Sequence, residues 1–147
     1  MDEKDRQILR LLEADGRLSN LALSEKVNLS PSACLRRVQE LERNGIITGY
    51  RAQLNAEQIG RGFVVFVAVG LAEHSKEAQQ GFERAMARAP EVAECHNIAG
   101  AFEYLLRVET SDLAAYKRFH TETLGTVPQV RSITSHMVMD TTKDLRR

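Results

Sequence analysis

A short segment around residue 36 carries polar side chains whose types and spacing suit contacts with DNA bases. Arginine and glutamine have forked polar groups that pair with the edges of guanine and adenine in the major groove. In a helix that begins at Pro31, one narrow arc of the surface holds Ser32, Arg36, Gln39 and Arg43. The opposite side holds Cys34, Val38 and Leu41, flanked by Leu35. The pattern predicts a helix that packs through its apolar side and reads bases with its polar side; the alternative is a solvated charged face.

The signals that begin and end this helix are clear in the sequence. Ser30 is a suitable N-cap, and Pro31 stands at the first helical position, where its missing N–H costs nothing. Gly45 is expected to end the helix.

Two further helices and a hairpin are predicted around it. One helix runs from about Glu3 to Ala14 with Asp2 as its N-cap, and Gly16 stops it. The next follows Ser19 and ends near Asn28, separated from the base-reading helix by a polar break. This arrangement is typical of a helix-turn-helix. The β-prone run 46–52 then predicts a small hairpin, or wing.

The predicted DNA contacts extend beyond the arc itself. Arg37 lies off it, so a phosphate contact or an ion pair with Glu40 or Glu42 suits this residue better. Arg51, in the expected wing, would contact a phosphate or be a plain surface arginine. Positive charge is local: residues 30–51 hold four arginines against two glutamates, although the whole chain has a formal net charge of zero. The complete predicted set is Ser30, Ser32, Arg36, Arg37, Gln39, Arg43 and Arg51.

The second half of the 147-residue chain alternates between strand and helix patterns. Strands are predicted at residues 63–71, 92–99, 102–110 and 130–139, and helices at 76–89 and 112–124. The order βαββαβ predicts a ferredoxin-like sandwich with two helices on one face of an antiparallel sheet. Gly100 and Ala101 would form a tight turn, and the second helix would carry on one side Leu113, Tyr116, His120 and Leu124.

The chain is therefore predicted to be an α+β protein of two domains. A winged helix-turn-helix is expected at residues 1–54, a linker at 55–61, the ferredoxin-like sandwich at 62–140 and a short tail at 141–147. The first strand, Phe63–Leu71, is apolar on both faces, although the helices can cover only one. A second copy of the sheet would cover the other face, which predicts a two-fold homodimer.

The paired motifs resemble one family over nearly the whole chain. The segment LSNLALSEKVNLSPSACLRRVQELERNGIITGYRA, followed by a βαββαβ unit containing ECHNIAGAFEYLLRVET, is similar to the Lrp/AsnC family (leucine-responsive regulatory protein / asparagine regulator, or feast/famine regulators). The resemblance implies a transcription regulator that binds double-stranded DNA and whose C-terminal half senses a small molecule, usually an amino acid. It also implies dimerisation through the sheets, assembly to tetramers or octamers, and effector binding where dimers meet.

The family's effector signature corresponds here to Gly100 through Leu106, with Ala101 and Glu103 departing from the common pattern. Glu103 would accept from the ammonium group of an amino acid, and free N–H groups near Gly100 would donate to its carboxylate. The alternatives are a turn glycine, a solvated acid and, for Tyr104, packing in the core. The predicted effector set is Gly100, Ala101, Glu103, Tyr104, Thr121, Thr123 and Ser135.

Other classes of function find less support in the sequence. No apolar stretch is long enough to span a membrane, and no signal-like N-terminus is present. Cys34 and Cys95 do not suggest a disulfide, which favours the cytoplasm. No catalytic motif or cofactor-binding motif occurs, and the scattered histidines, at positions 74, 96, 120 and 136, lack metal-binding spacing. The main alternative is a DNA-binding assembly protein without an effector, and a metal-responsive regulator is a more distant one.

Overall fold

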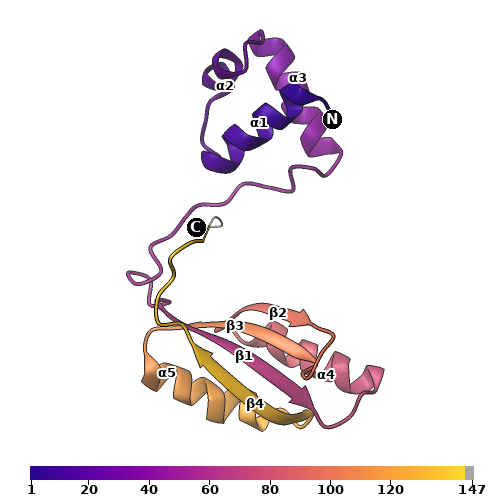
Figure 1. Cartoon of the computed structure of the whole chain (residues 1–147), viewed down its shortest axis with the longest axis vertical. Helices are drawn as coiled ribbons and strands as arrows, with labels where there is room; N and C mark the ends of the chain where they lie inside the picture. The colour runs from indigo at the N-terminus through magenta and orange to yellow at the C-terminus, as the bar shows by residue number, and fades with distance from the viewer. Residues whose placement is uncertain (145–147) are drawn as a thin grey trace. The chain divides into compact units, whose positions relative to one another are not determined.

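The computed structural model describes residues 1–144 and divides the chain into two compact units, Met1–Gln53 and a second that begins at Leu54. The first unit consists of helices α1 (Glu3–Ala14), α2 (Asn20–Lys26) and α3 (Pro31–Arg43), as predicted (Figure 1). The side chains of Asp2, Ser19 and Ser30 each accept a hydrogen bond from a backbone N–H of the helix that follows. The three helices bury a core of Ile8, Leu23, Val27, Cys34 and Leu41.

The segment after α3 differs from the prediction. Residues 46–52 contain no strand, so the expected hairpin is not formed. Gly45 adopts a positive φ of 69°, and the N–H groups of Ile46 and Ile47 both bond to the carbonyl of Leu41. Tyr50 Oη donates to Glu42 Oε1 at 2.8 Å. The segment thus folds back on the end of α3, and these contacts take the place of cross-strand pairs.

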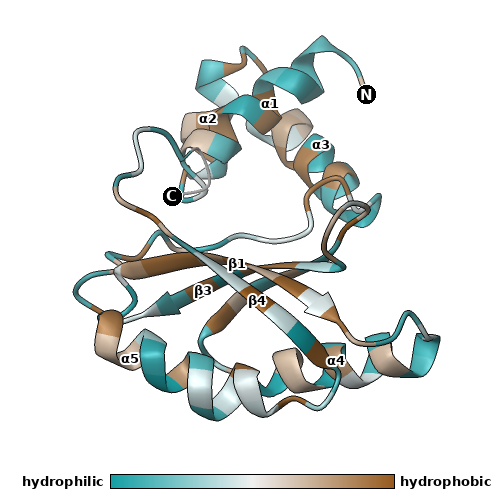
Figure 2. Cartoon of the chain, turned by 60° about the horizontal axis from the view of Figure 1, so that its bottom comes forward, coloured by the Kyte–Doolittle hydropathy of each residue, from teal (hydrophilic) through white to brown (hydrophobic). Residues whose placement is uncertain are grey.

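The second unit has the predicted ferredoxin-like topology. Strands β1 (Phe63–Leu71), β2 (Val92–Asn97), β3 (Tyr104–Thr110) and β4 (Val130–Met137) form one antiparallel sheet in the order β2-β3-β1-β4. Helices α4 (Lys76–Arg88) and α5 (Leu113–Arg118) lie on the same face of this sheet (Figure 2). The core between them includes Val67, Val69, Phe82, Tyr104, Leu106, Tyr116 and Leu124.

Two local predictions in this unit are wrong. The connection between β2 and β3 spans residues 98–103 and is closed by a bond from the N–H of Ile98 to the carbonyl of Glu103 (2.9 Å), so it is wider than a tight turn at Gly100. The last helix starts at Leu113 and passes into a π-helical turn (Phe119–Thr123) and a 3₁₀ turn (Leu124–Thr126). Leu113, in the first turn after the N-cap Asp112, is 55% exposed and does not share the buried side of Tyr116 and Leu124.

The second face of the sheet carries apolar and charged groups together. On this face β1 presents Val64, Phe66 and Ala68, since Val65, Val67 and Val69 point into the core. The guanidinium of Arg107 lies 5.5 Å above the ring of Phe66 and pairs with Glu109 at 2.9 Å. Within the described residues of the second unit, both α4 and α5 lie on the opposite face, so neither covers this one (Figure 2).

Candidate nucleic-acid interface and effector site

The outer side of α3 presents the polar arc that the sequence predicts. Ser32, Arg36, Gln39 and Arg43 are all exposed, while Cys34 (0%) and Leu41 (4%) are buried on the opposite side. Arg43 pairs loosely with Glu40 at 3.7 Å, and its side chain remains 75% exposed. The arc is therefore free to approach a groove. Leu35 is a correction: it is 45% exposed and does not flank the core.

Ser30 has a structural task at the start of this helix. Its Oγ accepts from the N–H of Ala33 at 3.2 Å and lies 3.3 Å from Ser32 Oγ. Asn20 Nδ2 donates to the carbonyl of Pro31 at 2.8 Å, which links the first turns of α2 and α3. The beginning of α3 is thus held by two neighbouring side chains, and Ser30 acts first as a cap.

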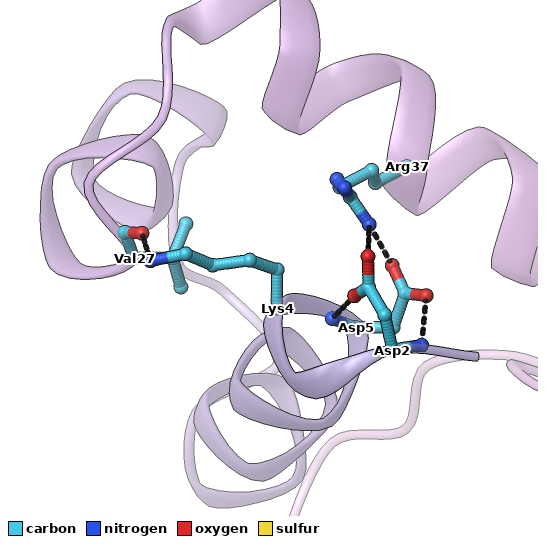
Figure 3. Close-up of polar contacts among 5 residues, drawn as sticks. All are labelled: Asp2, Lys4, Asp5, Val27 and Arg37. Atoms are coloured by element: carbon cyan, nitrogen blue, oxygen red, sulfur yellow. Dashed lines mark hydrogen bonds and ion pairs between the residues drawn. The ribbon is translucent and has the colours of Figure 1, made fainter.

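Arg37 is engaged within the protein. Its Nη1 donates to Asp2 Oδ2 and to Asp5 Oδ1, both at 2.8 Å (Figure 3). The predicted ion pair with Glu40 or Glu42 is therefore wrong. Asp2 and Asp5 also form a reciprocal capping box at the start of α1, and Lys4 Nζ donates to the carbonyl of Val27 at the end of α2. These contacts tie α1 to both helices of the helix-turn-helix.

The charge of Asp2 is expected to stabilise this unit above acidic pH. The backbone N–H of Asp5 and the guanidinium of Arg37 lower the pKa of Asp2 below its ordinary value of 3.8. A carboxylate with a lowered pKa stabilises the folded state above its unfolded pKa, and this contribution is lost as the pH falls through the folded pKa. Asp2→Asn keeps a competent N-cap and removes the charge. We expect wild type to melt above Asp2→Asn at neutral pH, with the difference shrinking below pH 3.8 and lost only as the pH falls through the lower folded pKa of Asp2. A difference that persists in acid would contradict the role of the charge.

Arg51 is exposed, in the segment that lacks the predicted hairpin. It is therefore available to a phosphate, but not from a wing built of two strands.

Glu103 is the centre of the second candidate site. Its side chain is 18% exposed, and its Oε2 accepts from the N–H of Leu71 at 2.8 Å at the end of β1. Its Oε1 lies 3.1 Å from Nδ1 of His74, whose side chain is 79% exposed. The carboxylate is thus held by a backbone N–H on one side and contacted by the exposed side chain of His74 on the other. The alternative of a solvated strand acid does not hold, because Glu103 precedes β3 and is mostly covered.

Gly70 allows these groups to come close together. A Cβ at this position would lie 2.3 Å from Ser132 Oγ and 3.7 Å from Glu103 Oε2. The β1–β4 pairing is also irregular between Gly70 and Leu71. This bulge turns the N–H of Leu71 toward Glu103.

The sequence interpretation missed His74, Ser132 and the N–H of Leu71 as neighbours of Glu103. A signal for them exists in the predicted topology, because β1 and β3 are antiparallel neighbours. Val69 pairs with Tyr104, so the end of β1 must lie beside the start of β3. The connection after β1, which holds His74, could have been placed there on that basis.

The other predicted effector residues divide among several places. Gly100 and Ala101 are exposed in the same loop as Glu103. Tyr104 is 1% exposed, and its Oη donates to Glu83 Oε1 at 2.6 Å, so it belongs to the core. Burial and Glu83 raise its pKa. Ser135 is half-buried on β4, and its hydroxyl is hydrogen-bonded to that of the core residue Tyr116.

The two threonines are also separate from Glu103. Thr121 Oγ1 bonds to the carbonyl of Lys117 in its own helix. Thr123 lines a pocket of about 380 Å³ at the far end of β3, where Glu109 and Thr110 lie. At ~3.4 Å per residue, the seven steps from Glu103 to Thr110 span about 24 Å, so one ligand of amino-acid size cannot touch both in the same protomer. Within one protomer, Thr123 is therefore far from Glu103, and the hydroxyls of Tyr104, Thr121 and Ser135 are bonded within the chain; their contact with an effector stays a prediction.

The thiols are poorly suited to nucleophilic chemistry at neutral pH. Burial raises the pKa of Cys34, and burial together with Glu83 raises that of Cys95 to about 11. Residues 1–144 contain no cluster of three or more potential metal ligands. Within the same residues, no helix has both the length and the apolar composition needed to cross a bilayer.

Comparison with known proteins matches both units of the chain to one family. A model of the Lrp/AsnC ligand binding domain matches residues 64–147, and a model of the winged helix-turn-helix DNA-binding domain matches residues 1–48. The leucine-responsive regulatory protein of Escherichia coli (strain K12) is 40% identical over 147 residues, which cover 100% of this chain and 90% of that protein. The protein of the same name from Salmonella typhimurium gives the same values.

Two solved structures of transcriptional regulators superpose on nearly the whole chain. The L-Met complex of a transcriptional regulator from Neisseria meningitidis superposes with a TM-score of 0.94 at 36% identity, covering 98% of this chain and 93% of that one. An AsnC family transcriptional regulator from Agrobacterium tumefaciens gives a TM-score of 0.92 at 35% identity, covering 98% and 94%.

Proposed function

The chain belongs to the Lrp/AsnC family of DNA-binding transcription regulators with an amino-acid-binding regulatory domain, and from this we propose how its own residues divide these tasks. Residues of α3 bind DNA, and Glu103 anchors an amino acid. The observation that carries the first part is the exposed polar arc on a capped helix. The second part rests on a carboxylate held by the main chain beside an exposed loop.

In the proposed DNA complex, α3 enters the major groove. Ser32, Arg36 and Gln39 read base edges, and Arg43 and Arg51 contact phosphates. Arg37 orients α3 through Asp2 and Asp5 and is left out of the phosphate contacts. The binding site lies on chromosomal DNA in the cytoplasm.

We propose a homodimer joined through the uncovered sheet face. On this face Phe66, which is only partly buried, alternates along β1 with Val64 and Ala68. A two-fold axis would bring the same apolar strip of two copies together. Two α3 helices should then contact half-sites about one helical turn apart, which a footprint would reveal. Further assembly to tetramers or octamers would bring the Glu103 loops of neighbouring dimers together around the effector.

Replacing Arg36 with alanine tests the DNA-binding face. Loss of a base-reading arginine should weaken binding to a selected operator by roughly 1–3 kcal/mol and relax the preference at one base pair. The measurement is a titration of wild type and variant on the operator and on its single-base variants. Arg17→Ala removes an exposed arginine outside α3 and serves as the matched control. Unchanged affinity and preference in Arg36→Ala would show that another face binds DNA.

A thermal-shift panel of the dialysed protein against the twenty amino acids tests the sensor. A ligand present at about a hundred times its dissociation constant adds roughly 2.7 kcal/mol to the folded state. For a chain of this size, each kcal/mol raises the melting temperature by about 2–4 °C. We expect a selective rise with one chemical class of amino acid.

The second candidate function is a DNA-binding assembly protein without an effector. One observation favours it: both oxygens of Glu103 already have partners in the chain, the N–H of Leu71 and His74. A flat thermal-shift panel, together with intact operator binding, would support this function instead.

A further inference from the structure

Leu35 occupies an unusual position on α3. In the first six residues of the helix, only Ala33 and Cys34 are turned away from solvent. The exposed side chains are Pro31, Ser32, Leu35 and Arg36. Leu35 is 45% exposed and does not belong to the residues that pack on the core of this unit. It therefore contributes little to the stability of the three-helix bundle.

The surroundings of Leu35 are those of the base-reading arc. On a helix, residues three and four positions apart are surface neighbours, so Leu35 lies beside Ser32 and Gln39 and is followed by Arg36. Single exposed leucines are common on protein surfaces. This one, however, lies in the N-terminal half of the recognition helix, the half that contacts base edges in helix-turn-helix complexes.

The major groove offers one apolar group to such a side chain. Guanine, cytosine and adenine present hydrogen-bond donors and acceptors there, whereas thymine also presents its C5 methyl group. We propose that Leu35 packs against the C5 methyl of a thymine and sets a preference for thymine at one position of each half-site. The proposal rests on the proposed function, since it requires α3 to lie in the major groove.

The test uses the full-length protein and DNA that differs by a single methyl group. A preferred site is first selected from a pool of random duplexes, and each thymine is then replaced in turn by uracil, which lacks the methyl. The hydrogen-bonding edge of the base does not change. For wild type, replacement at one position in one half-site should weaken binding about fourfold, the effect of one buried methyl group.

The variant Leu35→Ala identifies the side chain that contacts the methyl. It should bind the thymine duplex more weakly than wild type and lose the distinction between thymine and uracil at that position. Leu21→Ala is the matched control, because Leu21 is a 59% exposed leucine on α2. This control should keep the full preference for thymine. Melting curves of both variants check that they are folded, and the uracil series on wild type needs no variant at all.

Three results would overturn the proposal. They are a selected half-site without thymine, a wild-type protein indifferent to every uracil replacement, and a Leu35→Ala variant that still prefers thymine. If Leu35→Ala binds the thymine and uracil duplexes more weakly by the same factor, it still prefers thymine. That result also contradicts the proposal and would indicate that Leu35 contacts protein or sugar. If the selection returns no preferred sequence, the proposed function itself fails, so the two failures are distinguishable.

Discussion

Replacing Glu103 with glutamine is expected to remove most of the amino-acid binding while leaving operator binding intact. An ammonium group paired with a mostly buried carboxylate loses a charge-assisted bond when the carboxylate becomes an amide, at a cost of roughly 2–5 kcal/mol. Glutamine keeps a carbonyl oxygen that can accept from the N–H of Leu71, so the fold should tolerate the change. The measurement is calorimetric titration of the amino acid that gives the largest thermal shift.

The matched control for this experiment is Glu122→Gln. Glu122 is an exposed glutamate that lines the pocket at the other end of β3. It should bind the amino acid as wild type does. Equal affinities for wild type and Glu103→Gln, or a loss confined to Glu122→Gln, would move the effector site away from Glu103 and toward that pocket.

Replacing Phe82 with alanine is expected to lower the free energy of unfolding of the second unit by several kcal/mol, far more than the change at the exposed Leu113. Phe82 is fully buried on α4, with its ring 4.6 Å from that of Tyr104 between helix and sheet. Deleting a buried phenylalanine side chain costs about 3–5 kcal/mol, from lost burial and from the cavity that remains. For a domain of roughly this size, each kcal/mol lowers the melting temperature by about 4–8 °C. Calorimetry of the full chain should show the transition of the second unit shifted downward.

The first unit provides an internal reference for Phe82→Ala. Its own core, built around Ile8, Leu23 and Cys34, contains no residue of the second unit. Its transition should therefore stay in place. Leu113→Ala, at a 55% exposed position, should change the stability by no more than about 0.5 kcal/mol. Similar shifts for Phe82→Ala and Leu113→Ala would mean that the core is assigned incorrectly.

The helices and strands were predictable where local signals agree with the hydrophobic period. Asp2 and Ser30 cap the helices that they were expected to cap, and β1 has the predicted limits. The absence of a hairpin at residues 46–52 could not be predicted in the same way. The β-prone segment has no partner strand in the unit, and the hydrogen bond from Tyr50 to Glu42 favours a fold-back against α3.

The two candidate sites differ in how far local sequence signals could predict them. The polar arc of α3 follows from helical period alone, so its exposed face was correct. The environment of Glu103 depends on the register between strands distant in sequence and on a bulge at Gly70. A hydroxyl side chain cannot be assigned to a ligand from its residue type alone. Thr123 lines the pocket at the other end of β3, and Ser135 is hydrogen-bonded to the core residue Tyr116.

The existence of two separate cores has a consequence for how such regulators evolve. A substitution that repacks the sheet and its helices alters no side chain in the core of the three-helix unit, and substitutions without shared partners act nearly independently. After gene duplication, one copy can therefore acquire a new signal while it keeps its old binding sites on the chromosome. Equally, one copy can acquire new DNA-binding sites while it keeps its old signal. A recombination event near residue 53, where the two units meet in the sequence, could exchange one unit in a single step.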